Sequence, residues 1–276
     1  MDIRLIALDL DGTLLDSKTK LISDENLYAL TKAAEKGAFI VPATGRFFEA
    51  MPECVRKLPF LRYAITINGA KVIDVKTQDV IYTAEMPLAR GLQVLEYYKS
   101  IDVAYDAYID DNGYMGKDHI DRIEEYLDTP VYCETVRRMR IPVEDLIPFV
   151  KSRGHGIQKT QMFTTDRAKL VKARDQLSEM FPDLIATSSL KNNLEVNAKE
   201  ATKGQALAAL AKHLGIERRH IMAFGDGGND FDMIAFAGTG IVMAGGVGSL
   251  KKHAAFTTLS CDGNGVAYAI NKLMFK

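Results

Sequence analysis

Residues 9–13 read Asp9-Leu10-Asp11-Gly12-Thr13 and directly follow the mostly apolar run Ile3–Leu8. The run predicts a buried strand, so the two carboxylates stand where that strand ends and the chain turns. In α/β proteins, ligands bind at the carboxyl ends of strands. Two acids placed there repel each other and lose hydration, a cost that a divalent cation such as Mg²⁺ would relieve. A solvated Asp-Gly turn is the alternative, and these five residues alone leave both interpretations open.

Composition limits the classes of protein to which the chain can belong. Of its 276 residues, 47% are hydrophobic and 26% charged, and the net charge is −1. This balance is typical of a globular protein and gives no basic surface for nucleic acid or anionic membrane, so we expect neither partner. No apolar run has the ~18 residues of a membrane span, and no signal peptide is recognisable. Three widely spaced cysteines (Cys54, Cys133 and Cys261) predict free thiols in a reducing compartment, so we expect a cytoplasmic protein.

A second strand end carries residues suited to an anion. Ser23 is a plausible N-cap for a helix that runs to about Lys36, and residues 38–41 then predict a second buried strand. That strand leads into Thr44-Gly45-Arg46, which offers a hydroxyl, backbone N–H groups and a guanidinium to an oxyanion. For this tripeptide alone, a capped turn is the simpler interpretation.

The following segment completes a strand–helix alternation. Residues 63–67 predict a third strand, so the pattern up to this point indicates a parallel sheet covered by helices. Asn68-Gly69 then predicts a hairpin turn, and residues 71–74 and 79–83 alternate like paired short strands.

From about residue 84 the pattern changes to a mixture of helices and paired strands. We interpret residues 84–188 as a separate α+β unit inserted into the first domain. The expected helices are 87–99, 120–127, 143–151 and 167–180, and the expected extended segments are 103–109, 161–164, 184–187 and 193–196. The run Asp110–Gly113 predicts a hairpin turn rather than a metal site, and the charged run Arg137–Arg140 predicts a solvated surface.

The last third returns to strand–helix alternation and carries a second acidic strand end. Lys203 begins a helix after Thr202, where the helix dipole disfavours a cation unless an anion lies nearby. Residues 220–224 predict a strand that leads into a Gly-rich turn with Asp226 and Asp230. Two acids four residues apart across such a turn can converge on one cation. A dinucleotide-binding loop is a poor fit, because the glycine fingerprint requires Gly where Asp230 stands.

Together these motifs resemble the haloacid dehalogenase-like (HAD) superfamily, and more narrowly its Cof-type phosphatases with a large C2-type cap. The resemblance rests on residues 9–15, 43–46, 67–70, 188–204 and 225–230, and so extends over nearly the whole chain. It implies an α/β fold: a Rossmann-like parallel-sheet core of residues 1–83 and 189–276, with an inserted α+β cap of residues 84–188. One departure follows Met243, where the branch commonly has Gly-Asn-Ala and this chain has Ala244-Gly245-Gly246.

The resemblance also implies a mechanism, a cofactor and roles for individual residues. Asp9 would attack the phosphorus of a small phosphomonoester, with sugar phosphates as the leading class, and Asp11 would act as general acid and base. One Mg²⁺ would be held by Asp9, by the backbone carbonyl of Asp11, by Asp226 and near Asp230. The implied phosphate-binding residues are Leu10, Thr44, Gly45, Lys203 and Asn229, with Arg46 and Asn68 in contact with substrate. The cap would close over the site and contact the leaving group.

Two other functions remain open from the sequence. A phosphomutase of the same fold would pass the phosphoryl group to a second substrate hydroxyl instead of to water. A non-catalytic phospho-ligand or regulatory module would also place acids at strand ends, but it would not need a second acid, Asp11, two residues after the acceptor. The hydrolase is therefore the leading hypothesis.

Overall fold

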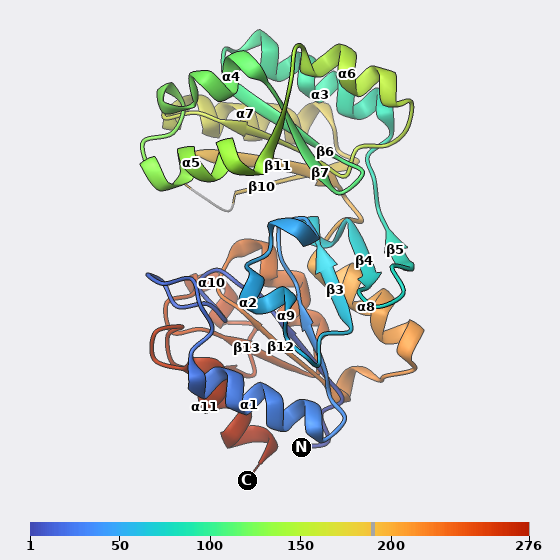
Figure 1. Cartoon of the computed structure of the whole chain (residues 1–276), viewed down its shortest axis with the longest axis vertical. Coiled ribbons are helices and arrows are strands. Elements are labelled where there is room, and N and C mark those ends of the chain that lie inside the picture. Colours follow the sequence, from blue (N-terminus) through green and yellow to red (C-terminus); the bar gives the residue numbers. More distant parts are fainter. Residues whose placement is uncertain (189–190, 276) are drawn as a thin grey trace. The chain divides into compact units, whose positions relative to one another are not determined.

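The computed structural model describes residues 1–188 and 191–275 and divides into two compact units (Figure 1). The core unit comprises residues 1–83 and 201–276, and the inserted unit comprises residues 84–200. The sequence placed the return to the core at residue 189, which is too early. The inserted unit continues to Glu200 because β11 (Asn193–Ala198) is paired on both sides, with β9 (Lys159–Phe163) and β10 (Leu184–Thr187).

The core unit is built on a five-stranded parallel sheet, counted over the described residues, in the order β14-β13-β12-β1-β2. The order places β1 (Leu5–Leu8) between β2 (Phe39–Pro42) and β12 (Ile221–Gly225). Beyond them lie β13 (Thr239–Val242) and β14 (Phe256–Thr257), a two-residue strand that the sequence did not indicate. All of β1 is buried, as a strand covered on both faces requires.

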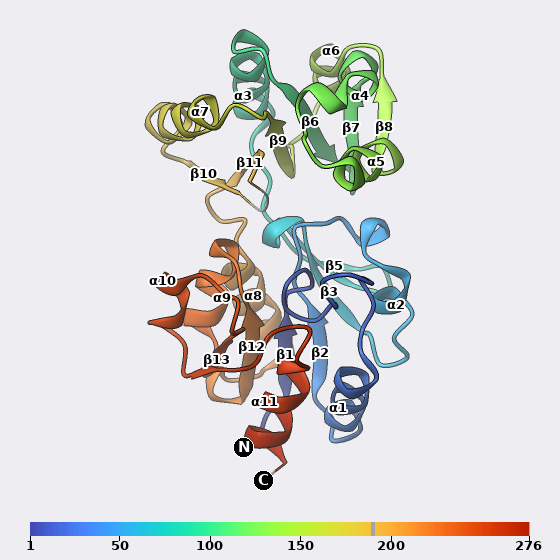
Figure 2. The ribbon, with the colours of Figure 1, turned by 90° about the vertical axis from the view of Figure 1, so that its left-hand side faces the viewer.

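Helices cover both faces of this sheet (Figure 2). Ile6 and Leu8 face the cluster that includes α1 (Asp24–Glu35) and α11 (Gly265–Met274). Leu5 and Ala7 face the opposite cluster, which includes α8 (Lys203–Leu214) and α9 (Phe231–Phe236). The short helices α2 (Glu53–Arg56) and α10 (Gly248–Lys251) complete the unit. Alternate side chains of β1 thus pack against helices on opposite faces of the sheet.

The helix boundaries follow the capping residues that the sequence shows. The Ser23 side chain accepts a hydrogen bond from the Asn26 N–H at the start of α1, and Thr202 accepts one from the Gln205 N–H at the start of α8. Gly215 has a positive φ of 66° just after α8, where a residue with a side chain would be strained. The predicted N-cap at Ser23 is confirmed, and Thr202, expected to precede a helix, is found to cap it.

The third strand lies outside the parallel sheet. β3 (Tyr63–Thr66), β4 (Lys71–Asp74) and β5 (Val80–Thr83) form an antiparallel sheet, and one isolated bridge, Ala43 to Ile65, joins β3 to the segment after β2. The sequence analysis had placed this strand in the parallel sheet, and the expected hairpin explains why it lies elsewhere. Asn68 and Gly69 adopt left-handed φ values of 58° and 96°, so the chain reverses at once and β4 pairs along the whole of β3.

The inserted unit contains a six-stranded sheet, counted over the described residues, in the order β10-β11-β9-β6-β7-β8. Its remaining elements are α3 (Leu88–Ser100), β6 (Ala104–Ile109), β7 (Asn112–Gly116), α4 (Lys117–Asp121), α5 (Pro130–Met139), β8 (Arg140–Val143), α6 (Leu146–Arg153) and α7 (Arg167–Met180). The predicted turn at residues 110–113 is confirmed, because it joins β6 to β7 as a hairpin. The sequence did not indicate α5 or β8.

The charged run 137–140 is only partly a solvated surface. Arg137 is ion-paired with Glu124 in an exposed position, but the side chain of Arg140 is buried. Its Nε lies 2.6 Å from Oδ2 of Asp106, and the two side chains are 8% and 0% exposed. The prediction was wrong for Arg140 because its partner lies 34 residues away on β6, and only the pairing of β6, β7 and β8 brings the two together.

Candidate active site

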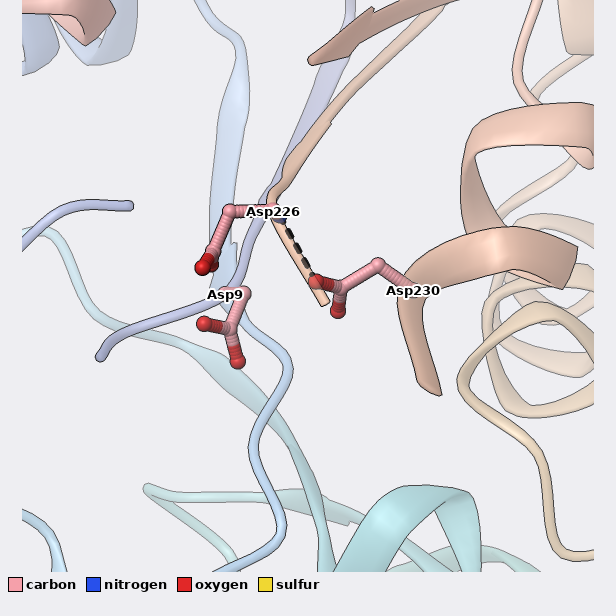
Figure 3. A group of neighbouring side chains, drawn as sticks. All are labelled: Asp9, Asp226 and Asp230. Atoms are coloured by element: carbon pink, nitrogen blue, oxygen red, sulfur yellow. Dashed lines mark hydrogen bonds between the residues drawn. The ribbon is translucent and has the colours of Figure 1, made fainter. Parts of the chain in front are cut away.

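Two acidic strand ends of the core unit meet at one point. β1 and β12 are parallel neighbours with Leu8 opposite Phe224, so the residues that follow them lie side by side. Asp9 follows β1, and Asp226 follows β12; Asp230 ends the short 3₁₀ turn Gly228–Asp230 that comes next. One carboxylate oxygen from each of these three residues lies within 4.8 Å of the others, and Figure 3 shows the three side chains gathered at the strand ends.

A buried lysine connects two of the three carboxylates. Nζ of Lys203 lies 2.5 Å from Oδ1 of Asp9 and 2.6 Å from Oδ1 of Asp230, and the lysine side chain is fully buried. Lys203 is the first residue of α8, the position where the helix dipole disfavours a cation. The anions that stabilise it there include Asp9 and Asp230 themselves.

Backbone N–H groups fix the position of Asp230. Its Oδ2 accepts hydrogen bonds of 2.9 Å from the N–H groups of both Asp226 and Gly227, and the first of these is drawn in Figure 3. A Cβ on Gly225 would lie 2.5 Å from the Cβ of Asp230, so only glycine lets the strand end pass this close. The Gly-rich turn therefore holds one oxygen of Asp230 with backbone donors and leaves the other for Lys203.

The first motif positions Asp226 through two residues to which the sequence analysis gave no role. Oγ1 of the buried Thr13 donates a 2.9 Å hydrogen bond to Oδ1 of Asp226. Gly12 has a φ of +85°, and a Cβ there would lie 2.5 Å from Oδ2 of Asp226. The only sequence signal was their place within the quoted motif, since their partner lies more than 200 residues away.

Burial and repulsion from neighbouring carboxylates disfavour the ionised forms of Asp9 and Asp226. Burial raises the pKa of the Asp9 carboxyl well above its usual range; the Lys203 ammonium opposes this rise, and Asp230 adds to it. Burial likewise raises the pKa of Asp226, with a further contribution from Asp230. Burial alone would lower the pKa of Lys203, but Asp230 and Asp9 outweigh that effect and raise it. One ammonium does not neutralise three carboxylates, so the cluster has the oxygen donors and the excess negative charge that suit a divalent cation.

Residues of the second motif lie close to Asn68 and Asn229, which were also expected to bind phosphate or substrate. Thr44 and Asn68 are both buried, and the Thr44 N–H donates to the Ile65 carbonyl oxygen at 3.0 Å. Nδ2 of Asn229 donates to Oδ1 of Asn68 at 3.3 Å, and a Cβ on Gly45 would lie 2.8 Å from the same oxygen. The fold therefore brings Gly45, Asn68 and Asn229 together, although they come from separate motifs.

Asp11 lies apart from the three-carboxylate group, and an arginine holds it. Its side chain is 43% exposed, and its Oδ2 accepts hydrogen bonds of 3.1 and 2.8 Å from Nε and Nη2 of Arg46. Lys20 adds a longer ion pair of 3.6 Å. The backbone carbonyl of the buried Leu10 accepts from the N–H groups of residues 13, 14 and 15, which folds the motif into a tight loop. Arg46, expected at the substrate, thus has Asp11 as its partner in the structure.

The loop in which the sequence departs from its expected relatives adjoins Asp226. The Val247 N–H donates a 3.0 Å hydrogen bond to the Asp226 carbonyl oxygen, and a Cβ on Gly246 would lie 3.2 Å from the Asp226 Cα. The loop of residues 244–249 therefore supports the backbone of one acid and contributes no carboxylate of its own.

Known proteins share both this sequence and this fold. A family model for haloacid dehalogenase-like hydrolases matches residues 6–270. Two Bacillus subtilis 5-amino-6-(5-phospho-D-ribitylamino)uracil phosphatases, YwtE and YcsE, are 31% and 28% identical to this chain; the matches cover 98% of this chain in both cases, and 98% and 95% of the relatives. A solved haloacid dehalogenase-like hydrolase from B. subtilis superposes with a TM-score of 0.85 at 27% identity, over 99% of this chain and 100% of its own.

The chain therefore belongs to the haloacid dehalogenase-like hydrolase family. Its parallel-sheet core and additional sheet domain match the solved structures of that family, as the resemblance implied. Within the family it is a phosphatase, a phosphoric monoester hydrolase that acts on a small phosphorylated substrate. No helix within residues 1–188 and 191–275 has the length and apolar character to cross a lipid bilayer.

Proposed function

We propose that this phosphatase is Mg²⁺-dependent and hydrolyses small phosphorylated metabolites through an aspartyl-phosphate on Asp9. The observation that carries the proposal is the convergence of Asp9, Asp226 and Asp230 beside the buried ammonium of Lys203. Burying so many charged groups lowers the stability of the fold, so stability does not explain the cluster. A bound cation and a phosphoryl group would use all four side chains.

The metal would be held by Asp9, Asp226 and the backbone carbonyl of Asp11, with Asp230 close by. These are hard oxygen donors, which suit Mg²⁺, and Gly12 leaves room beside Asp226 that a side chain would fill. A bound Mg²⁺ would supply charge neutralisation between the nucleophile and the phosphoryl oxygens.

Asp9 would be the nucleophile. A carboxylate oxygen of Asp9 forms the new bond to phosphorus while the bond from phosphorus to the leaving oxygen breaks, and the leaving alkoxide takes a proton from Asp11. Asp11 then accepts a proton from the water that attacks the phosphorus, releasing inorganic phosphate and restoring Asp9. Arg46 would orient the Asp11 carboxylate for both steps, because it already donates to one of its oxygens.

Phosphoryl oxygens would be bound by donors that surround the cluster. The candidates are the ammonium of Lys203, the hydroxyl of Thr44, the amide of Asn229 and the backbone N–H groups of Leu10 and Gly45. Stabilising the equatorial oxygens in the transition state is the main catalytic contribution in phosphoryl transfer. Asn68 would position Asn229 through their hydrogen bond and contact the substrate from there.

For the leaving group we propose a sugar or polyol. Two relatives that match nearly the whole chain are phosphatases of a 5-phospho-D-ribitylamino compound, in which the phosphate sits on a polyol chain. The sequence-based prediction of a cytoplasmic location stays a prediction, and the three free thiols support it.

The proposal is tested by phosphate release from a panel of sugar, polyol and nucleotide monophosphates, with Mg²⁺ and with EDTA. We expect release that depends on Mg²⁺ and is fastest for a sugar or polyol phosphate. Release that persists in EDTA would contradict the metal assignment. Phosphate transfer to a second sugar, with no free phosphate from any single ester, would indicate the mutase.

The proposed metal site predicts different effects for two glycine substitutions. Gly12→Ala would lower the affinity for Mg²⁺ by about tenfold or more, because the new methyl group displaces the Asp226 carboxylate. Gly37→Ala is the matched control, since Gly37 has a similar φ of +89° but no heavy atom within 4 Å of the added Cβ. Both variants should lose on the order of 1 kcal/mol of stability from backbone strain. Calorimetric titration with Mg²⁺ separates the effects, and equal Mg²⁺ affinities would refute the site.

A further inference from the structure

The inserted unit has a cavity of about 260 Å³ that contains none of the residues discussed above as catalytic. It lies among the end of α3, the start of β6, the junction of β7 with α4, and the junction of β8 with α6. Its volume is below the ~300–1,000 Å³ typical of pockets for drug-sized ligands, so it suits a smaller molecule.

The lining of this cavity is strongly acidic. It includes the carboxylates of Asp102, Asp118, Glu144 and Asp145 against one ammonium, that of Lys99. Lys117 forms an ion pair with Glu144, and the excess is still negative after that pair is counted. The Asp145 carboxylate also caps α6 by accepting from the Ile147 N–H, which fixes its position. The cavity therefore favours a cation.

Two polar side chains of the lining have unused hydrogen-bonding capacity. Tyr105 is only 6% exposed, yet its hydroxyl has no hydrogen-bond partner among residues 1–188 and 191–275. The His119 ring packs edge-on against Tyr105 at 4.7 Å between ring centroids, and its Nε2 lies 3.9 Å from the nearest Asp118 oxygen, beyond hydrogen-bond distance. Burial lowers the pKa of His119, which favours the neutral ring. One nitrogen of a neutral ring can accept a hydrogen bond. Buried side chains normally have partners for their polar atoms, so the unpaired hydroxyl of Tyr105 points to a ligand, and the half-buried His119 ring beside it offers a second contact.

The arrangement of the carboxylates distinguishes between kinds of cation. Among the described residues, Asp9, Asp226 and Asp230 form the one group of three acidic, His or Cys side chains whose ligand atoms converge within 4.8 Å. The carboxylates of this cavity are instead spread around its wall. A metal ion needs ligand atoms that converge on one point, so this arrangement does not suit one. A cation with N–H donors at several separated atoms would match that spread, as well as the hydroxyl and the imidazole.

We propose that this cavity is a binding site for a small organic cation with two or more N–H donor groups, such as an aliphatic diamine. Its ammonium groups would donate to Asp118, Glu144 and Asp102, and a remaining N–H would donate to the Tyr105 hydroxyl or the His119 nitrogen. This site is independent of the proposed phosphatase mechanism and can be tested without any assay of activity.

The test is calorimetric titration of the full chain with 1,4-diaminobutane at low ionic strength. We expect saturable binding that weakens as salt is added, and no binding of the uncharged 1,4-butanediol. Asp118→Asn and Tyr105→Phe should each lower the affinity, the first by about tenfold, because a charge-assisted hydrogen bond is lost. Asp121→Asn is the matched control, since this exposed residue lies on the same helix, α4, outside the cavity.

Three outcomes would overturn the proposal. The first is that the wild-type chain gives no saturable heat with the diamine. The second is that Asp118→Asn and Asp121→Asn bind the diamine equally well. The third is binding of Mg²⁺ or Ca²⁺ that competes with the diamine and is lost in Asp118→Asn, which would make this a metal site. Asp118 has a largely exposed side chain and Tyr105→Phe keeps the ring, so neither variant should fail to fold.

Discussion

Asp9→Asn should abolish phosphate release, lowering kcat by about three orders of magnitude or more, as expected when a covalent nucleophile is removed. The amide is nearly the same size as the carboxylate, so the packing around residue 9 is preserved, but an amide oxygen is too weak a nucleophile to form a stable bond to phosphorus. The variant should also be at least as stable as the wild type without metal. Burial disfavours the ionised Asp9, and the substitution removes that unfavourable charge.

Asp2→Asn is the matched control for this experiment. Asp2 precedes β1 at its opposite end, has a side chain 61% exposed and pairs with Arg4 at the surface. The kcat of the Asp2→Asn variant should equal that of the wild type. Single-turnover experiments should trap a phosphorylated wild-type enzyme and none in Asp9→Asn. If Asp9→Asn kept a tenth of the wild-type turnover while folded and bound to Mg²⁺, another residue would be the nucleophile.

Lys203→Met should lower the free energy of unfolding by about 3–5 kcal/mol in the absence of metal, as is typical when one partner of a buried ion pair is removed. The reason is that Asp9 and Asp230 lose the ammonium that lies 2.5 and 2.6 Å from their oxygens in a fully buried position. Urea unfolding measures the change. Added Mg²⁺ should restore part of the loss, because a cation at the carboxylates replaces some of the missing positive charge.

Lys212→Met, the same substitution in the last turn of α8, is the control and should change stability by no more than about 0.5 kcal/mol, because Lys212 is exposed. Adding Asp9→Asn to Lys203→Met should recover stability, since it removes one of the two unpaired carboxylates. A loss below about 1 kcal/mol for Lys203→Met would mean that Asp9 and Asp230 do not depend on the lysine, and would contradict the electrostatic account.

The general form of the fold could be predicted because local patterns determine it. The apolar runs before Asp9 and Asp226 predicted buried strands, and two such strands in a parallel sheet bring the acids that follow them to one edge. Capping residues such as Ser23 and Thr202 fixed where helices begin, since an N-cap acts on the first turn alone. The catalytic and binding roles given to these residues stay predictions until the variants are measured.

What the sequence could not provide depends on contacts between distant residues. Arg140 looked like a surface residue because its charge partner, Asp106, lies on another strand. The end of the inserted unit was misplaced because Asn193–Ala198 resembles any short strand, and only its pairing with β9 and β10 assigns it. The support of Asp226 by Thr13 and Gly12 was equally invisible, since no local pattern links residues more than 200 positions apart.

The discontinuity of the core unit has a consequence during synthesis on the ribosome. β1 pairs with β12, and Leu5 lies opposite Ile221. The β12 side of β1 therefore cannot pair until residue 221 and its neighbours have been synthesised. The inserted unit, by contrast, is one continuous segment of residues 84–200, with all its strands available before β12 is translated. We expect this segment to fold first on the nascent chain, while the emerging amino-terminal segment, with its apolar β1, remains exposed to chaperones. The cluster of Asp9, Asp226, Asp230 and Lys203 would then be among the last parts of the molecule to assemble.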